Sequence, residues 1–331
     1  MAPNLNNDRL EIRHIEHPTR EALKYIDSRR KGTVKSLRTR WKKFNRACNG
    51  GIEPNVILSI GGGSGMGKSS FVNTLESDLL DLNPDQDFVV LSFSFEMLGY
   101  RNVGRKLSYK TKKTTSELYN GDPDKKTISD NEFDTLIKEG EIIRQYPIYY
   151  VDRPGTVEQI KNTIEYFRMT TAKGKWLVII LDHSLLVRPR NGDGERETIA
   201  NLQRLFMEVK KWGRISIIQL TQLNRNIELP ERISNPVMHY PKRSDVFASD
   251  SIFHASDYMM VIHRPEILHI ERYGPNKLPT KDLVFLHILK NRDGEAKVLT
   301  FKNNLKYNSI EELSTEELYQ LINSNQKDYG S

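Results

Sequence analysis

The chain has 331 residues, of which 37% are hydrophobic and 28% are charged, a composition typical of a globular protein. Its N-terminus lacks the apolar core of a signal peptide, and no stretch approaches the roughly 18 apolar residues of a membrane span. The single cysteine, Cys48, excludes an intramolecular disulfide, and the net charge of +7 favours a polyanionic partner. These features predict a cytoplasmic protein without a membrane partner.

The first predicted element is a short helix over residues 19–30, preceded by a polar segment, 1–18, that we expect to be flexible. Ala22, Leu23 and Ile26 fall on one face of this helix. A helix this short cannot bury its own apolar face, so it must pack on another surface. We assign residues 19–48 to a linker made of this helix and a basic connector.

From Gly50 onward, apolar runs alternate with helical patterns. Several runs are continuous and rich in Val and Ile, which is typical of strands covered on both faces. Their alternation with helices indicates an α/β fold with a mostly parallel sheet. The predicted strands span residues 56–60, 88–95, 148–151, 176–181, 215–220, 258–262 and 283–289.

The alternation fails over residues 224–250, where we expect a long loop. A loop of this length inside a compact domain is more often functional than idle. Order returns near the C-terminus, where Ser314 and Glu317 form a capping box. Residues 309–331 are therefore predicted to be a final helix and tail.

The strongest chemical signal is the segment Gly62-Gly63-Ser64-Gly65-Met66-Gly67-Lys68-Ser69, which fits the phosphate-loop pattern GxxxxGK[ST]. Its glycines let backbone N–H groups face phosphates, and the following helix N-terminus favours negative charge. Lys68 is expected to reach the β- and γ-phosphates of ATP, Ser69 to hold Mg²⁺, and Ser70 to line the same site. A chance glycine-rich turn is the alternative, which the flanking strand and helix patterns disfavour.

Two carboxylates follow other predicted strands. Asp182 ends the run 176–181, where a Walker B aspartate would hold the metal, because ligands collect at the carboxyl ends of parallel strands. Glu96 ends the run 89–95 and is our candidate general base for the attacking water. By position alone, Glu96 could equally be a helix-start carboxylate without a catalytic role.

Further motifs occur in a consistent order along the chain. They are Asn49-Gly-Gly-Ile-Glu-Pro54, Phe93-Ser-Phe-Glu-Met97, Arg105 nine residues after Glu96, Ile148–Thr156, Thr221-Gln-Leu-Asn-Arg225 and Lys290-Asn-Arg292-Asp-Gly294. Together they resemble the DnaB-type replicative helicases, which are RecA-like ATPases. The resemblance runs from about residue 19 to residue 304 and marks Arg105 as a nucleotide-site residue.

The resemblance implies a RecA-like ATPase domain over residues 49–308, with a twisted, mostly parallel sheet flanked by helices. It implies a homo-oligomeric ring, usually a hexamer, with ATP held between subunits. Glu96 would activate water and Gln222 would sense the γ-phosphate. Lys290 and Arg292 would act in trans, since an inserted arginine stabilises transition-state charge; otherwise they are exposed charges on a turn.

The segment after Gln222 is expected to contact single-stranded DNA. Its candidate DNA-binding residues are Arg225, Arg232, Lys242 and Arg243. Tyr240 is the only clear aromatic residue near the basic pair Lys242-Arg243, so we expect contacts to the DNA backbone with little preference for DNA sequence. Two basic runs without acids, 29–46 and 101–113, are either solvated faces or further polyanion surfaces.

The sequence departs from the family in two places. Phe247-Ala248 and Phe253-His254 stand where the family has Arg-Glu and Glu-Gln, so charges that could couple nucleotide state to DNA loops are missing. The linker helix is also preceded by only about 18 residues, so we expect no N-terminal collar domain. Such a compact form suggests a phage or mobile-element protein.

We therefore predict an ATP-driven translocase on single-stranded DNA that uses ATP and Mg²⁺ and acts as a replicative helicase. Its expected partners are single-stranded DNA, further copies of the chain, and a separate primase or loader. A RecA-like recombination, repair or DNA-remodelling ATPase is the first alternative, and a nucleotide-gated scaffold is the second. Strand separation that depends on Lys290 and Arg292 would distinguish the helicase.

Overall fold

The computed structural model describes residues 10–235 and 239–327, so the predictions for residues 1–9, 236–238 and 328–331 lie outside the described chain. The chain divides into one unit that ends at Ser36 and a second that begins at Leu37. Among the described residues, no helix is both long and apolar enough to cross a bilayer.

The first unit contains helix α1 (Glu16–Arg30). The helix begins three residues before the predicted start, because Pro18 lies in its first turn, where a missing N–H costs no hydrogen bond. The apolar residues Leu23 and Ile26 are exposed. In the last turn of the helix, the Arg29 guanidinium donates a hydrogen bond of 3.0 Å to the Ser36 hydroxyl.

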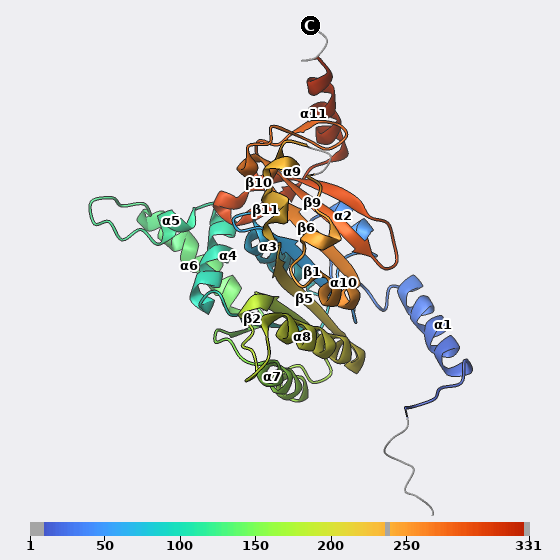
Figure 1. The fold of residues 1–331 in the computed structure, drawn as a ribbon. Coiled ribbons are helices and arrows are strands. Elements are labelled where there is room, and N and C mark those ends of the chain that lie inside the picture. Colours follow the sequence, from blue (N-terminus) through green and yellow to red (C-terminus); the bar gives the residue numbers. More distant parts are fainter. Residues whose placement is uncertain (1–9, 236–238, 328–331) are drawn as a thin grey trace, which may run out of the picture. The chain divides into compact units, whose positions relative to one another are not determined.

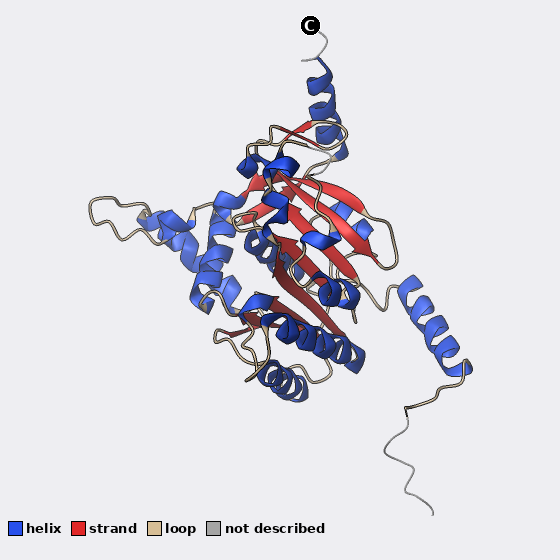
Figure 2. Ribbon diagram, viewed as in Figure 1, coloured by secondary structure: helices blue, strands red, loops and turns tan. Residues whose placement is uncertain are grey.

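The second unit is built on a sheet that contains nine strands within the described residues, in the order β11-β10-β9-β6-β1-β5-β4-β2-β3 (Figures 1 and 2). The half from β6 to β3 is parallel, and β9, β10 and β11 extend it with antiparallel pairing. The strands are β1 (Ile57–Gly62), β2 (Phe88–Ser94), β3 (Ile148–Val151), β4 (Trp176–Asp182), β5 (Ile215–Gln222), β6 (Tyr258–His263), β9 (Leu283–Asn291), β10 (Lys297–Asn304) and β11 (Ser309–Glu312). A separate pair consists of β7 (Arg272–Tyr273) and β8 (Leu278–Pro279).

Helices cover both faces of the parallel half of the sheet. The helices described in the second unit are α2 (Lys42–Ala47), α3 (Lys68–Asp81), α4 (Gly99–Thr111), α5 (Thr115–Leu118), α6 (Asp130–Arg144), α7 (Val157–Met169), α8 (Glu195–Val209), α9 (Pro230–Ile233), α10 (Ser249–Ala255) and α11 (Thr315–Lys327). Within β4, Val178 packs with the cluster that holds α2 and α3, whereas Ile179 packs with α7 and α8. This two-sided burial confirms the α/β fold predicted from the continuous apolar runs, with strand ends extended by one or two residues in most cases.

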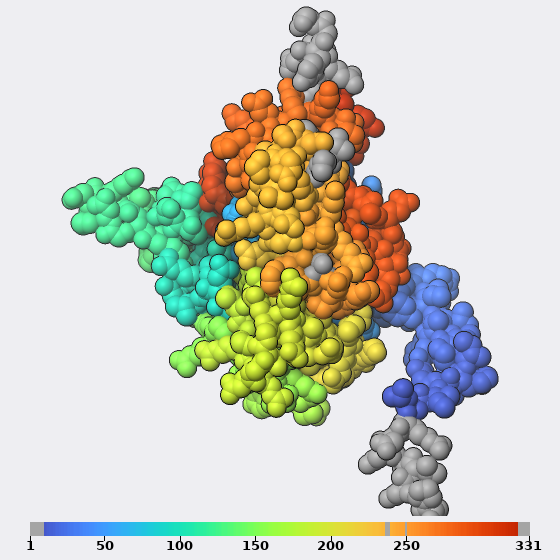
Figure 3. Space-filling view, viewed as in Figure 1, coloured from blue at the N-terminus to red at the C-terminus, as the bar shows by residue number. Residues whose placement is uncertain are grey.

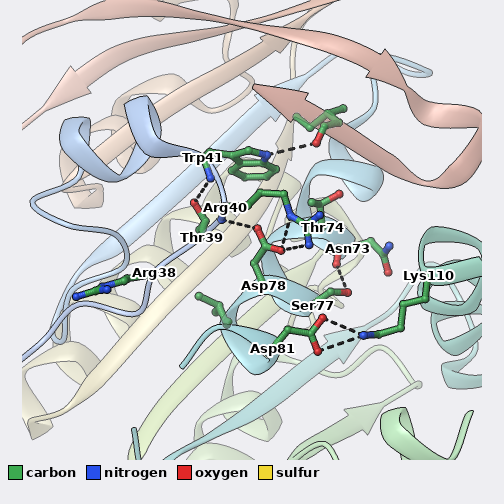
Figure 4. A network of polar contacts seen from close by, with 12 residues as sticks. Arg38, Thr39, Arg40, Trp41, Asn73, Thr74, Ser77, Asp78, Asp81 and Lys110 are labelled. Atoms are coloured by element: carbon green, nitrogen blue, oxygen red, sulfur yellow. Dashed lines mark hydrogen bonds and ion pairs between the residues drawn. The ribbon is translucent and has the colours of Figure 1, made fainter. Parts of the chain in front are cut away.

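Residues 37–48, predicted to belong to the linker, pack into the second unit. Trp41 and Phe44 are fully buried, and the Trp41 ring stacks on Phe71 of α3 at a centroid distance of 4.6 Å. The Arg40 guanidinium pairs with Asp78 of α3 at 2.6 Å, as Figure 4 shows. The contacts therefore divide the chain after Ser36. The composition of the sequence predicts the boundary at residue 48, because Trp41 and Phe44 lie within a basic run that is typical of an exposed connector.

The C-terminal region contains strands that the sequence did not predict. β10 and β11 pair antiparallel with each other, so residues 309–312 complete the sheet edge before α11 begins. Both strands are rich in polar residues, and only the inner part of β10 is buried, which hides the apolar pattern. The predicted capping box exists, since the Ser314 amide donates to Glu317 and the Glu317 amide donates to Ser314.

Residues 224–250 are more structured than the expected loop, since the described part contains α9 and the start of α10. The segment is tied to the sheet near its C-terminal end, because the Phe247 amide donates to the Gln222 carbonyl at 3.0 Å. In Figure 3 this gold-coloured segment lies at the visible surface above the yellow-green residues that follow β4. A small cleft lined by Arg196, Asn224 and Phe247 marks where the two segments meet.

Candidate active site

The phosphate loop leaves β1 at the centre of the sheet and enters α3 at Lys68. Its backbone requires glycine at two positions, because Gly65 and Gly67 have φ values of +71° and +99°. At Gly62, an added Cβ would lie 3.0 Å from the Ile262 carbonyl oxygen. The curled backbone, which presents N–H groups ahead of a helix N-terminus, is the arrangement that binds phosphates.

Lys68 lies across this loop. Its Nζ donates to the carbonyl oxygens of Gly62 at 2.7 Å and Gly63 at 2.9 Å. Burial lowers the pKa of Lys68, and the nearby carboxylates of Asp182 and Glu96 oppose that shift. A partly desolvated ammonium on the phosphate loop is suited to pair with phosphate oxygens.

Asp182 occupies the carboxyl end of β4, as the sequence predicted. Burial raises the pKa of Asp182 to about 6, with a further upward contribution from Glu96. Its Oδ1 is buried and has no hydrogen-bond partner among the described residues. Asp182 and Ser69 also line the same small internal space. An unpaired carboxylate oxygen beside a hydroxyl fits Mg²⁺, which prefers oxygen ligands.

Glu96 and Arg105 approach from the neighbouring strand and helix. β2 pairs with β4 so that Ser94 lies opposite Asp182, which carries Glu96 to the same edge of the sheet. Glu96 is exposed to solvent at the cleft, and Arg105 of α4 also lines the cleft. Burial lowers the pKa of Arg105, while Asp182 and Glu96 favour its charged form.

Gln222 ends β5 on the other side of the loop. The β1–β5 register places Gln222 opposite Gly62, so its side chain lies beside the phosphate loop. The cleft has a volume of about 560 Å³. Its lining comprises Gly63, Ser64, Gly65, Gly67, Lys68, Ser69, Ser70, Glu96, Arg105, His183, Leu185, Leu186, Gln222, Arg264 and Leu305.

The predicted residue Met66 does not line the cleft but is buried beneath it, where its sulfur accepts the Arg264 amide at 3.3 Å. Arg264 itself was missed by sequence reasoning. Its Nη1 donates to the Gly65 carbonyl at 3.1 Å, and it pairs with Glu266 at 2.5 Å. Arg264 directly follows β6, so the carboxyl-end rule that identified Asp182 could have found it.

Leu305 was also missed, whereas His183, which directly follows Asp182, reads from the sequence as a hydrogen-bonded crevice residue rather than a zinc ligand and does line the cleft. His183 follows Asp182 through a cis peptide bond, and its Nδ1 accepts the Leu185 amide at 3.3 Å. Burial lowers the pKa of His183, and Lys68 adds to that effect. Leu305 arrives from the turn after β10 and faces Gly67, a placement that depends on the unpredicted antiparallel strands.

Lys290 and Arg292 are not brought to this cleft. The Lys290 ammonium donates to the Phe253 carbonyl at 2.6 Å, and the Arg292 guanidinium lies 3.3 Å from Asp257. In the register of β9 and β6, Lys290 lies opposite Met259, near the start of β6 and at the end of the sheet opposite the phosphate loop. The two cations are therefore positioned away from the nucleotide cleft of their own chain.

The four candidate DNA-binding residues differ in exposure. Arg225 and Lys242 are exposed, and Arg243 is exposed while it pairs with Asp250 at 2.7 Å. Arg232 is buried, and its guanidinium forms two bonds with Asp245 of 2.6 and 2.9 Å. The structure does not support DNA contact by Arg232, because a buried ion pair occupies its charged group.

The fold and the cleft together define a class of protein. A mostly parallel sheet carries a glycine-rich loop on its central strand, with a lysine and two carboxylates gathered at the same edge. This arrangement is a P-loop nucleotide-binding domain of the RecA-like type.

The chain belongs to the DnaB-like helicase C-terminal domain family, whose model matches residues 16–312. It is 25% identical over 238 residues to the replicative DNA helicase DnaB of Buchnera aphidicola subsp. Baizongia pistaciae, covering 71% of this chain and 48% of that protein. It is 24% identical over 246 residues to DnaB of Pasteurella multocida, covering 74% and 48%. The chain thus spans about half the length of these relatives.

Solved structures agree on the fold. A separately solved ATPase domain superposes with a TM-score of 0.75 at 19% identity, covering 92% of this chain and all of that one. A DnaB-like replicative helicase, described with its interactions with primase, gives a TM-score of 0.74 at 19% identity and covers 92% and 68%. The predicted RecA-like fold and family resemblance are confirmed, and family membership implies nucleotide use.

Proposed function

We propose that this chain is the ATP-driven motor of a ring-forming replicative DNA helicase that translocates on single-stranded DNA. The observation that carries the proposal is the cleft that gathers Lys68, Glu96 and Gln222, with Asp182 in the small internal space that shares Ser69 with it, in a chain of the DnaB-like family. The alternative of a recombination or repair ATPase has no comparable support from the family match.

In this proposal the cleft binds and hydrolyses ATP. The loop N–H groups and Lys68 hold the phosphates, with Ser70 and Arg105 at the rim. Ser69 and Asp182 would hold Mg²⁺, which when bound neutralises developing phosphate charge. Glu96 accepts a proton from the attacking water, because it is an exposed carboxylate at the cleft beside the cations.

Lys290 and Arg292 complete the site of a neighbouring subunit. They lie at the opposite end of the sheet from their own phosphate loop, about 13 Å away along the strands at 3.3 Å per residue, so they cannot serve it. A head-to-tail assembly brings one subunit's cations to the next subunit's cleft, and it closes as a ring when the rotation permits. We propose a hexamer.

The DNA contact is assigned to Arg225, Lys242 and Arg243. These exposed cations lie on the segment that starts at the sensor residue Gln222, so a strand bound there adjoins the nucleotide cleft. A separate primase or loader is the proposed protein partner, by analogy with the helicase whose structure was described with primase.

Steady-state ATP hydrolysis tests the function. We expect hydrolysis that single-stranded DNA stimulates and that rises steeply with protein concentration, because each site needs two subunits. Lys68→Ala should abolish it, whereas replacement of the exposed Lys138, outside the cleft, should not. A rate indifferent to DNA would exclude the translocase.

A mixing experiment tests the trans arrangement. Glu96→Gln removes the base in cis, and Arg292→Ala removes the cation in trans, so each variant alone should lose most hydrolysis, on the order of 10³-fold. Mixed rings contain some interfaces that join an intact Glu96 to an intact Arg292, so activity should return in part. If rings that are shown to be mixed recover no activity, Arg292 does not act in trans on the site of a neighbouring subunit.

A further inference from the structure

A buried contact behind the nucleotide cleft joins two parts of the molecule. His263 is the last residue of β6, and His239 belongs to the segment that follows Gln222. Their rings lie 3.0 Å apart between Nε2 of His263 and Nδ1 of His239, and both side chains are fully buried. Neither the phosphate-loop motif nor the DNA-binding prediction accounts for this pair.

One end of the contact reaches the phosphate loop. Arg264, the next residue after His263, donates to the Gly65 carbonyl at 3.1 Å through its side chain. Its backbone amide donates to the Met66 sulfur at 3.3 Å. The end of β6 is therefore held to the residues that cradle the phosphates.

The other end reaches the proposed DNA segment. His239 is next to Tyr240, whose carbonyl accepts a bond of 3.1 Å from Arg232. Arg232 forms the buried pair with Asp245, and the Asp245 carbonyl accepts the Asn224 amide at 2.7 Å. Asp245 also accepts the Lys242 amide at 2.8 Å. These hydrogen bonds hold together the backbone segments that carry Arg225, Lys242 and Arg243.

The chemistry of the contact suits a fixed link. Burial lowers the pKa of His239 and of His263, and the Arg232 charge lowers both further, so both rings are neutral near pH 7. Two neutral imidazoles can form one directional hydrogen bond, with one ring donating and the other accepting. The bond exists only while the two segments hold this relative position.

We propose that His239 and His263 are positioning residues that carry the state of the phosphate loop to the DNA-binding segment. The proposal rests on the helicase function and adds a route that does not use the sensor Gln222. It also supplies a connection where Phe247 and Ala248 replace the charged pair of the family. A coupling of this kind is reciprocal, so nucleotide state must change DNA affinity and DNA must change nucleotide affinity.

The experiment measures the affinity of the full chain for a labelled single strand with Mg²⁺ and either ADP or the non-hydrolysable analogue adenylyl imidodiphosphate. The ratio of the two dissociation constants is the coupling. His239→Phe keeps an aromatic ring but removes the hydrogen bond, so the ratio should move towards one by roughly 2- to 30-fold. His239→Asn can replace Nδ1 and should retain part of the ratio. DNA-free hydrolysis should remain unchanged in both.

Tyr273→Phe provides a matched control. The Tyr273 hydroxyl bonds to His287 at 3.1 Å in the same buried cluster but lies outside the route, so its loss should leave the ratio unchanged. A wild-type ratio in a folded His239→Phe chain would overturn the link alone. A wild-type chain without any nucleotide dependence of DNA binding would overturn the helicase function and the link together.

Hydrogen exchange in the wild-type chain gives a second readout if His239→Phe fails to fold. Exchange of the backbone amides at 224–235 and 239–245 should differ between ADP and the analogue without DNA. Lys68→Ala, which weakens phosphate binding, should remove the difference. Equal exchange in both nucleotide states of the wild type would overturn the link.

Discussion

At Gly67 the backbone limits which residue the phosphate loop accepts. Its φ of +99° is a conformation that side chains rarely adopt, and an added Cβ would lie 2.8 Å from Leu305. Gly65 has a φ of +71°, but an added Cβ there meets nothing within 4 Å. A substitution at Gly65 therefore tests backbone strain alone, whereas a substitution at Gly67 tests backbone strain together with the contact to Leu305.

Gly67→Ala should weaken binding of MgADP more than Gly65→Ala does. Each change costs about 1–3 kcal/mol of backbone strain, and Gly67→Ala also forces Leu305 away. Calorimetric titration with MgADP measures both. Leu305→Ala in the Gly67→Ala background should recover part of the affinity, and no recovery would show that strain alone is responsible.

The cations of the run 101–113 illustrate what residue type alone cannot reveal. The run reads as a solvated or polyanion-binding surface, but three of its cations pair with acids of the same chain. Lys106 is buried against Glu76 of α3, Lys110 pairs with Asp81 at 2.9 Å, and Lys113 pairs with Glu132 at 2.5 Å. The acids come from other elements, so the run carries no sequence signal of its pairing.

At the scale of elements, predictability follows burial. β1, β2, β4 and β5 were predicted because both of their faces are covered, which leaves uninterrupted apolar runs. β10 and β11 were missed because polar residues occupy most of their positions. Glu96, Asp182 and Gln222 follow or end predicted strands, so the sequence places them at one edge of the sheet, whereas Leu305 depends on β10 and was not predicted there.

The junction between residues 37–48 and α3 gives a test at this scale. Asp78 is fully buried and accepts the Arg40 amide at 2.8 Å and the Arg40 side chain at 2.7 Å (Figure 4). Arg40→Ala leaves that carboxylate with the backbone bond alone and should lower the free energy of unfolding by about 1–3 kcal/mol.

Urea denaturation measures this loss. Arg38→Ala is the matched control, because the Arg38 side chain is exposed and points away from Asp78 in Figure 4. It should change the free energy of unfolding by no more than about 0.5 kcal/mol. Equal effects of the two substitutions would contradict a structural role for the Arg40–Asp78 pair.

At the scale of the whole molecule, buried histidines link stability to pH. Burial lowers the pKa of His287 to about 3, and burial also lowers the pKa of His239 and His263. The unfolded chain therefore takes up protons that the folded chain refuses below pH 6.5. The stability is complete above that pH and is lost as the pH falls towards the folded values.

The free energy of unfolding should fall by up to about 1.4 kcal/mol per pH unit for each histidine between pH 6 and pH 5. His287→Gln removes one titrating group and should make that slope shallower. His17, which is exposed, provides the control His17→Asn with an unchanged slope. Urea denaturation at several pH values measures the slopes. Identical slopes in the wild type and both variants would contradict the burial of His287 in its neutral form.

The placement of Lys290 and Arg292 at the end of the sheet opposite the phosphate loop has a consequence for counting. Under the proposed trans arrangement, each chain carries two unlike halves of a hydrolytic site, so complete sites equal the number of interfaces rather than the number of chains. A closed ring of n subunits has n complete sites, and a ring opened at one interface has n − 1. Opening the ring to admit a strand therefore silences the site at the gap while the others remain intact.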